Sequence, residues 1–307
     1  MRTAFITTLE SLAGKNKNIF LLNGDLGFSV LEHFTKKFPR RAYNMGVAEA
    51  NMMGVAAGLA MSGKTVFVYS IIPFVTSRVF EQVRNDIALQ KANVKIVGVG
   101  SGLTYGPLGP THHAIEDLAI MRALPNMIVV APGDPKETAE ATKAIVSIKG
   151  PVYLRIGKKG EPEVYRRTPR FSLGKGIVVK TGNDCAIITT GNMLYTGVIV
   201  FKKLQEKRLR ARLIALHTVK PLDERIIKKA AKETRAIFTL EEHSIIGGLG
   251  SAVAEVLAEN NINTHFRRFG IRDRFLPKTG SQDYLRSIHQ LSPSAITRTI
   301  ISDLSKK

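Results

Sequence analysis

One carboxylate opens an apolar, small-residue segment near the start of the chain. Glu49 precedes residues 50–60 (ANMMGVAAGLA), and this pattern predicts a helix over 48–61. A helix N-terminus stabilises an anion, and small residues allow close backbone approach, so Glu49 is a candidate functional carboxylate. The alternative is a first-turn residue that only balances the helix dipole.

Two adjacent histidines lie in a Gly/Pro-rich loop. Residues 102–117 (GLTYGPLGPTHHAIED) follow a predicted buried strand and lead into a predicted helix over 115–123. The side chains of His112 and His113 point in different directions if the loop is extended, and no third ligand is spaced nearby. We therefore expect no metal ligands here.

A third segment combines an aromatic residue with arginines. Residues 69–86 (YSIIPFVTSRVFEQVRND) contain Phe74, Arg78 and Arg84, and the pattern predicts a helix over 75–91. A lone phenylalanine usually packs in the core. Surface ion pairing explains both arginines as well as a functional role does.

Length and composition predict a two-domain enzyme. A chain of 307 residues exceeds the usual size of one domain. Cys185 is the single cysteine, which excludes an internal disulfide and a multi-cysteine metal site. No apolar stretch approaches about 18 residues, and residues 1–14 lack an apolar signal core. We expect a cytoplasmic protein.

The formal charge of +20 restricts the partners. Basic residues are spread along the chain in short groups, such as 36–41 and 207–212, and form no basic tail. Solvated surfaces are the favoured explanation. Phosphorylated substrates, an acidic partner chain and nucleic acid remain as alternatives.

Short β-branched runs alternate with helical patterns, which predicts parallel sheets flanked by helices. We expect an α/β fold with two successive domains, residues 1–160 and 174–307, joined by a Lys/Arg/Gly/Pro-rich linker over 161–173. The strands expected in the first domain are 18–22, 65–70, 94–99, 127–131 and 152–156, and its helices 30–38, 48–61, 75–91, 115–123 and 135–147. The second domain is expected to have strands at 176–179, 185–190, 212–217 and 236–240, helices near 194–206 and 223–234, a helix after the glycines of 247–250, and then a strand and a final helix.

These segments, taken in order, resemble the C-terminal half of transketolases. The matches include Glu49 with its helix, the loop at 109–112 (GPTH), and 189–192, 217–223 and 240–250 in the second domain, and they cover roughly residues 1–303. The resemblance implies a pyrimidine-binding domain for thiamine diphosphate followed by a transketolase C-terminal domain. It implies transfer of a two-carbon ketol unit from a ketose to an aldose.

The resemblance also implies cofactor contacts. The family glutamate that Glu49 matches hydrogen-bonds N1′ of the aminopyrimidine ring and starts proton transfer, and Phe74 matches the aromatic residue stacked on that ring. Asp25 and Leu26 match a segment near the cofactor, and Arg78 is assigned to the same site.

Substrate contacts follow from the same resemblance. His112 matches a histidine that contacts substrate hydroxyls and stabilises developing oxyanions, and His113 replaces the usual glutamine. Ser29 and Arg155 match contacts to substrate phosphate, although a structural salt bridge explains Arg155 equally well.

Two positions depart from the family pattern. Leu108 replaces an aspartate that contacts a sugar hydroxyl, and Gly100 stands where a histidine is usual. The sugars used are therefore open.

The chain lacks the earlier diphosphate-binding domain with its Gly-Asp-Gly motif and later asparagine, which hold Mg²⁺ in this family. We expect those ligands to come from a separate N-terminal subunit, in an assembly of two plus two chains. A β subunit of a 2-oxoacid dehydrogenase, a pyruvate-condensing synthase, a non-catalytic scaffold subunit and a nucleic-acid binder are the alternatives.

Overall fold

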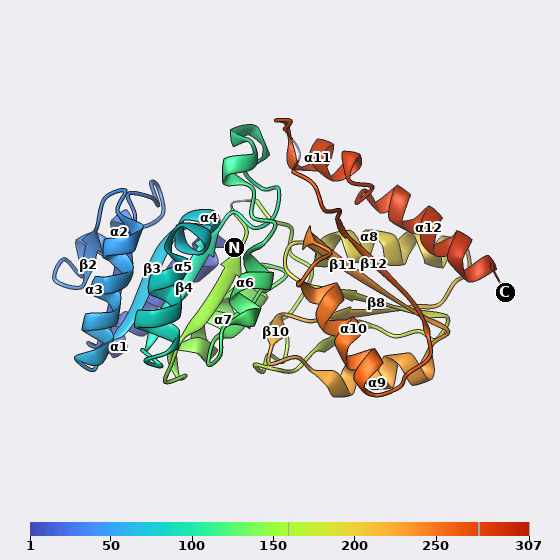
Figure 1. Cartoon of the computed structure of the whole chain (residues 1–307), viewed down its shortest axis with the longest axis horizontal. Helices are drawn as coiled ribbons and strands as arrows, with labels where there is room; N and C mark the ends of the chain where they lie inside the picture. Colours follow the sequence, from blue (N-terminus) through green and yellow to red (C-terminus); the bar gives the residue numbers. More distant parts are fainter. Residues whose placement is uncertain (159, 276, 307) are drawn as a thin grey trace.

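Two α/β domains lie side by side along the long axis of the molecule. The computed structural model describes residues 1–158, 160–275 and 277–306. The N-terminus lies near the middle of the molecule and the C-terminus at the far end of the second domain (Figure 1).

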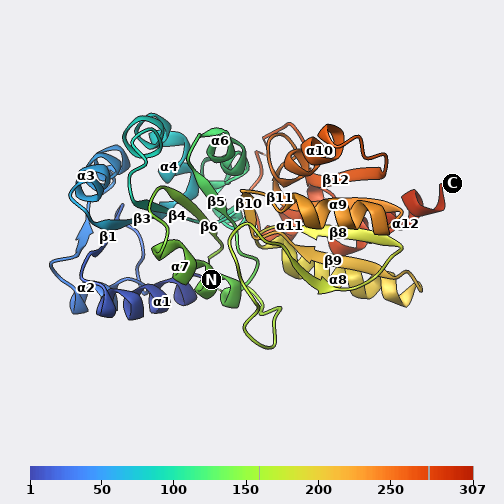
Figure 2. The same ribbon diagram turned by 90° about the horizontal axis from the view of Figure 1, so that it is seen from below.

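The first domain is built on a seven-stranded sheet with the order β10-β5-β6-β4-β3-β1-β2. Six of these strands are parallel, and helices cover both faces (Figure 2). The parallel strands are β1 (Ile19–Asn23), β2 (Ala42–Asn44), β3 (Thr65–Ile71), β4 (Val94–Val99), β5 (Ile128–Val130) and β6 (Val152–Ile156). The helices are α1 (Arg2–Lys15), α2 (Glu32–Lys37), α3 (Glu49–Met61), α4 (Ile72–Val75), α5 (Phe80–Gln82), α6 (Asp117–Ala123) and α7 (Pro135–Val146).

The second domain is built on a five-stranded sheet with the order β12-β11-β8-β9-β7, in which only β7 is antiparallel to its neighbour. Apolar clusters pack α9 and α10 on one face and α8, α11 and α12 on the other. The strands are β7 (Ile177–Lys180), β8 (Cys185–Thr189), β9 (Ala211–Ala215), β11 (Ala236–Ser244) and β12 (His265–Ile271). The helices are α8 (Met193–Glu206), α9 (Glu224–Glu233), α10 (Leu249–Glu259), α11 (Gln282–Ile288) and α12 (Pro293–Ser305).

The predicted fold class is confirmed, with several differences in detail. The helices α1 and α11 were not predicted. The prediction of a single helix over 75–91 was wrong. The backbone of Thr76 leaves the helical region (φ −124°, ψ −81°), and the segment divides into several short helical pieces. The short strand β2 was not predicted. Strand β10 (Thr218–Lys220) was also not predicted, and it pairs with β5 of the first sheet although the sequence places it in the second domain.

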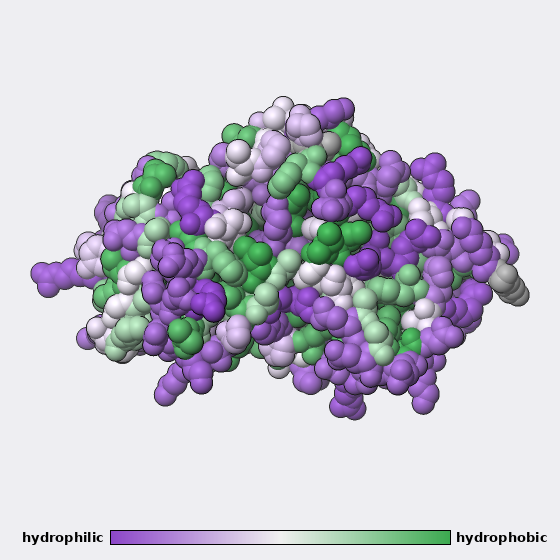
Figure 3. Space-filling view, viewed as in Figure 1, coloured by the Kyte–Doolittle hydropathy of each residue, from purple (hydrophilic) through white to green (hydrophobic). Residues whose placement is uncertain are grey.

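The surface is largely polar. Hydrophilic side chains cover much of the face seen in Figure 3 and project along its outline, as expected for a chain with 45 Lys and Arg against 25 Asp and Glu. None of the helices in residues 1–158, 160–275 and 277–306 has the length and apolar character needed to span a bilayer.

A buried arginine, paired with a carboxylate of its own domain, also bonds to the second domain. Arg155, at the end of β6, donates from Nε to Asp117 Oδ2 at 2.7 Å, and both side chains are 1% exposed. Its Nη2 donates to the carbonyl oxygens of Ala114 (2.9 Å) and Glu242 (3.0 Å), and Glu242 belongs to the second domain. Through these hydrogen bonds the guanidinium connects β6 with the start of α6 and with the end of β11.

Substitution Asp117→Asn is expected to destabilise the chain strongly. It leaves the Arg155 charge buried without a counter-charge, which typically costs about 3–5 kcal/mol. Urea denaturation would measure the loss. Glu140→Gln, which removes an exposed ion pair with Lys143, should cost less than about 1 kcal/mol. Equal losses for the two variants would contradict a structural role for the buried pair.

The linker is fixed against both domains. Asp134, at the N-cap of α7, accepts the backbone N–H groups of Val164 (3.0 Å) and Tyr165 (3.2 Å). Further along, the ring of Phe171 stacks on His217 with centroids 4.0 Å apart. Burial lowers the pKa of His217 to about 4, so the native protein keeps this ring neutral.

His217 is expected to make stability pH-dependent. As the pH falls from 6.5 to 4, the unfolded chain protonates this residue while the native chain does not. Its contribution to the free energy of unfolding therefore falls by about 3 kcal/mol over that window.

Comparison of wild type with His217→Gln in urea denaturation at several pH values isolates this effect. The pKa values of Glu137 and Glu241 are raised to about 7 by burial, and these groups oppose the trend equally in both proteins. The stability difference between the two proteins should shrink towards pH 4. A constant difference would contradict the prediction.

Candidate active site

Glu49 lies buried at the carboxyl ends of two strands. It is the first residue of α3 and is 1% exposed. Its Oε1 accepts the Ser70 hydroxyl at 3.1 Å, at the end of β3. A Cβ built on Gly24, just after β1, would lie 3.1 Å from Oε1, so a side chain there would crowd the carboxylate. The sheet therefore holds one desolvated carboxylate at its edge.

Arg78 is the second partner of this carboxylate. Its Nη1 donates to Glu49 Oε2 at 2.7 Å, while its side chain remains 44% exposed. Its guanidinium carbon also lies 4.1 Å from the centre of the Phe74 ring. The planar guanidinium of Arg78 thus packs on the Phe74 ring and donates a hydrogen bond to Glu49.

His112 joins the same group. Its ring meets Phe74 edge to face, with centroids 5.3 Å apart and planes at 71°. Its Nδ1 lies 3.0 Å from the Thr111 hydroxyl, in a 3-10 turn over Pro110–His112. The structure therefore brings together four predicted residues from three segments.

Asp25, Leu26 and Ser29 form a neighbouring loop. Asp25 has a left-handed backbone (φ 52°) and exchanges two hydrogen bonds with Asn44, at 3.0 and 2.9 Å. Asp25 and Leu26 line an open cavity of about 390 Å³, and the backbone N–H of exposed Ser29 donates to Glu32 at 2.6 Å. The predicted cofactor and phosphate contacts of this loop stay predictions.

The side chains of His113 and Arg155 have surroundings of their own. His113 is 5% exposed, and burial lowers its pKa; its neighbours include the backbone of Gly106 and the Glu242 carboxylate. Arg155 is committed to Asp117 and two carbonyl groups. This geometry favours the structural salt bridge over the predicted phosphate contact of Arg155, and it gives no support to the predicted substrate contact of His113.

The two departures from the family pattern have different surroundings. At Gly100 (φ +89°) a Cβ would lie 2.1 Å from Tyr105 Cε2, so the Tyr105 ring fills the space that a side chain at position 100 would need. Leu108 is 53% exposed.

Sequence reasoning missed Ser70 and Gly24. Ser70 is the last residue of the predicted strand 65–70, and Gly24 lies two residues beyond the predicted strand 18–22. Residues at the carboxyl ends of parallel strands commonly line sites. A search of the carboxyl ends of the predicted strands could therefore have identified both residues.

The site fits the pyrimidine part of thiamine diphosphate. A buried carboxylate can accept an N–H from a ring, and the Arg78 guanidinium already shows that a flat donor fits between Glu49 and Phe74. Within the described residues, no three His, Cys, Asp or Glu side chains are grouped to hold a metal.

Both domains match known families. Residues 1–161 match the pyrimidine-binding domain of transketolase, and residues 174–296 match the transketolase C-terminal domain. The chain is 41% identical over 310 residues to a putative transketolase C-terminal section of Methanocaldococcus jannaschii, covering 100% of this chain and 97% of that protein. It is 38% identical to one subunit of the apulose-4-phosphate transketolase of Phocaeicola vulgatus, covering 99% of this chain and 97% of that subunit.

A solved structure is similar over the same length. It is described as a split gene transketolase, inactive beta4 tetramer, and it aligns with a TM-score of 0.88 and 38% identity. The alignment covers 99% of this chain and 97% of that one.

A double-mutant cycle should detect the Glu49–Arg78 interaction. Arg78→Gln leaves a buried carboxylate with only the Ser70 hydroxyl, which costs about 1–3 kcal/mol, whereas Glu49→Gln/Arg78→Gln removes the unpaired charge. Urea denaturation of the four proteins without cofactor should give a coupling of about 1–2 kcal/mol. The exposed pair Glu224–Lys228 is the control and should give about 0.5 kcal/mol or less. The same small value for Glu49–Arg78 would contradict this interpretation.

Proposed function

The chain belongs to the transketolase family, and from that premise we propose that it is the β-type, C-terminal subunit of a heteromeric, thiamine diphosphate-dependent transketolase. It transfers a two-carbon ketol (glycolaldehyde) unit from a phosphorylated ketose to an aldose acceptor. The observation that carries this proposal is the contact set around Glu49, Phe74 and Arg78.

Arg78 is the residue that the cofactor displaces. Its guanidinium lies against Phe74 and donates to Glu49, which are the two contacts an aminopyrimidine ring needs. Because this side chain is 44% exposed, it can swing into solvent at little desolvation cost. With the cofactor bound, Glu49 would form a hydrogen bond with the pyrimidine N1′, and Phe74 would pack against the ring.

Thiamine diphosphate, when bound, supplies the carbon nucleophile that cleaves a ketose beside its carbonyl group. Glu49 holds or moves the proton at N1′, and its burial strengthens that hydrogen bond. The Ser70 hydroxyl keeps Oε1 of the carboxylate in place, so Oε2 faces the ring.

His112 acts on the substrate side. Its ring contacts Phe74 by its edge, while Thr111 holds Nδ1. Because Nδ1 is engaged, Nε2 is the atom that hydrogen-bonds substrate hydroxyls and the oxygen on which charge develops.

A partner chain completes the site. The two matched domains do not include a diphosphate-binding domain, and a relative that matches over nearly its whole length is named as one subunit of a transketolase. The partner supplies the Mg²⁺ ligands, in an assembly of two plus two chains. The similar structure described as an inactive β4 tetramer supports the view that β-type chains alone do not turn over.

Reconstitution tests the proposed function. The chain, a diphosphate-domain partner, thiamine diphosphate and Mg²⁺ are assayed for glycolaldehyde transfer across a panel of ketose phosphates and aldoses. Turnover should require both chains. Glu49→Gln should lower kcat by about 100-fold or more, because it removes a group that moves a proton. Glu140→Gln, an exposed substitution on α7, should leave kcat unchanged.

Other results would point elsewhere. Decarboxylation of pyruvate or another 2-oxoacid would replace the proposal by dehydrogenase or synthase chemistry. A stable complex that binds cofactor but transfers nothing would favour a scaffold role. Near-normal turnover by Glu49→Gln would contradict the role given to that residue.

A further inference from the structure

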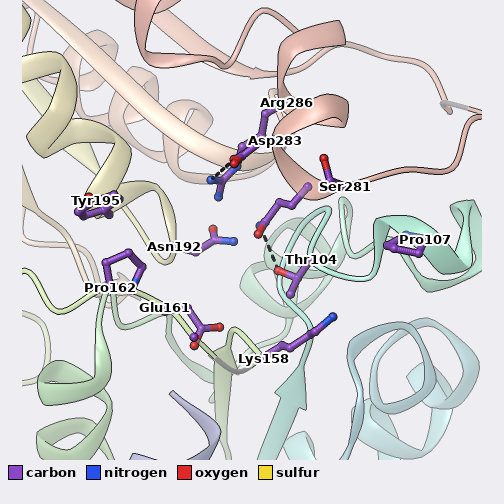
Figure 4. A pocket seen from close by; sticks show the side chains of 13 residues that line it. Thr104, Pro107, Lys158, Glu161, Pro162, Asn192, Tyr195, Ser281, Asp283 and Arg286 are labelled. Atoms are coloured by element: carbon purple, nitrogen blue, oxygen red, sulfur yellow. Dashed lines mark hydrogen bonds and ion pairs between the residues drawn. The ribbon is translucent and has the colours of Figure 1, made fainter.

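A second cavity lies between the two domains, apart from the site around Glu49. It has a volume of about 460 Å³. Figure 4 shows the side chains of Asn192, Arg286 and Thr104 pointing into this space from different elements. A cavity of this size accommodates a small metabolite.

The carboxyl ends of strands from both sheets meet at this cavity. Thr104 follows β4, Gly133 follows β5, Lys158 follows β6 and Asn192 follows β8. In open parallel α/β sheets, ligands bind outside the carboxyl ends of the strands. The docking of the domains thus brings two such edges to one place.

Two cations reach the cavity. Glu242 holds Arg286 by Nε (2.9 Å) and Nη2 (3.0 Å), and the exposed carboxylate of Asp283, which also lines the cavity, lies 3.7 Å from Nη1. Among the same residues, no carboxylate lies within ion-pair distance of Lys158, whose Nζ lies 5.4 Å from the centre of the Tyr105 ring. Figure 4 shows these two cations on opposite sides of the cavity, whose lining also includes Glu161, paired with the N-terminal ammonium at 2.8 Å. A guanidinium and an ammonium group that line one cavity can each donate to an anion such as phosphate.

Asn192 leaves a hydrogen-bond acceptor unused. Its Nδ2 donates to Glu242 and to the Ser101 carbonyl oxygen, which fixes the orientation of the amide. The side chain is 9% exposed, and its Oδ1 has no donor in the part of the chain that the structure describes. A buried acceptor without a donor costs free energy, which a ligand hydroxyl would recover.

Tyr195 gives the cavity an aromatic wall. It lies in the first turn of α8 and is 40% exposed. The apolar face of a sugar ring can pack on such a surface, while the positive end of the α8 dipole favours a nearby anion.

We propose that this cavity is a binding site for a small sugar phosphate, separate from the proposed catalytic site. Lys158 and Arg286 bind the phosphate, Asn192 Oδ1 accepts a sugar hydroxyl, and Tyr195 packs against the ring. Because both domains contribute, occupancy stabilises their docking.

A single-tryptophan reporter tests this site. The chain has no tryptophan, so Tyr195→Trp places one fluorophore in the cavity, and Val178→Trp on β7, with 46% exposure, is the matched control. The full chain is titrated with ribose 5-phosphate, ribose and inorganic phosphate. Only the cavity reporter should respond, and ribose 5-phosphate should bind at least about tenfold more tightly than the other two probes.

A second substitution locates the phosphate contact. Lys158→Gln in the reporter chain should raise the Kd for ribose 5-phosphate about tenfold, because it removes a charge-assisted hydrogen bond. Lys202→Gln on the exposed side of α8 should not change it. Calorimetry with the unlabelled chain and the same lysine variants repeats the measurement if tryptophan at 195 disturbs folding.

Three outcomes would overturn the proposal. They are equal responses from both reporters, equal affinity for inorganic phosphate and ribose 5-phosphate, and no effect of Lys158→Gln. Sugar phosphates are also the proposed substrates, so His112→Ala is included. That substitution should leave the reporter's Kd unchanged even where it abolishes transfer, so failure here and failure of the proposed function remain distinguishable.

Discussion

The buried Arg155 guanidinium is the constraint on which the arrangement of the two domains depends. A charge without access to water must find a counter-charge and further acceptors, and Arg155 finds Asp117 in its own domain and a carbonyl oxygen of Glu242 in the other. The same guanidinium binds the Ala114 carbonyl oxygen, at the end of the loop that carries His112. The guanidinium that bonds to both domains therefore also holds one end of the loop that carries His112.

Glu49 is satisfied in a different way. The Asp117 carboxylate has partners that are themselves buried, whereas Glu49 is paired with an arginine that is 44% exposed. Exchange of that partner costs little desolvation because the guanidinium returns to water. The Asp117 carboxylate therefore has fixed partners and serves the architecture, whereas the Glu49 carboxylate can exchange its partner, as the proposed chemistry requires. The Ser70 hydroxyl holds Oε1 of the carboxylate during such an exchange.

Parallel sheets explain why the site around Glu49 and the cavity between the domains both lie at strand ends. Each sheet collects its loops, glycines and helix N-termini at the carboxyl ends of its strands. In the first domain, β1 and β3 form the site around Glu49 with residues of that domain alone. The ends of β4, β5 and β6 instead face β8 of the second domain, and the cavity between them exists only because the domains dock.

The sequence by itself determined the alternation of strands and helices and the two parallel sheets, and it singled out Glu49, Phe74, Arg78 and His112 among its candidate site residues. Periodic burial of apolar side chains is a local property, and the residues around those four follow a family pattern that can be read along the chain. Only the tertiary structure decided the antiparallel pairing of β10 with the first sheet, the break of the predicted helix at Thr76 and the commitment of Arg155 to a structural ion pair. It also decided that Arg78 lies between Glu49 and Phe74. The ionic contacts among these features join residues 29 or more positions apart, and they depend on which charges lose contact with water when elements dock. A local pattern does not carry that information.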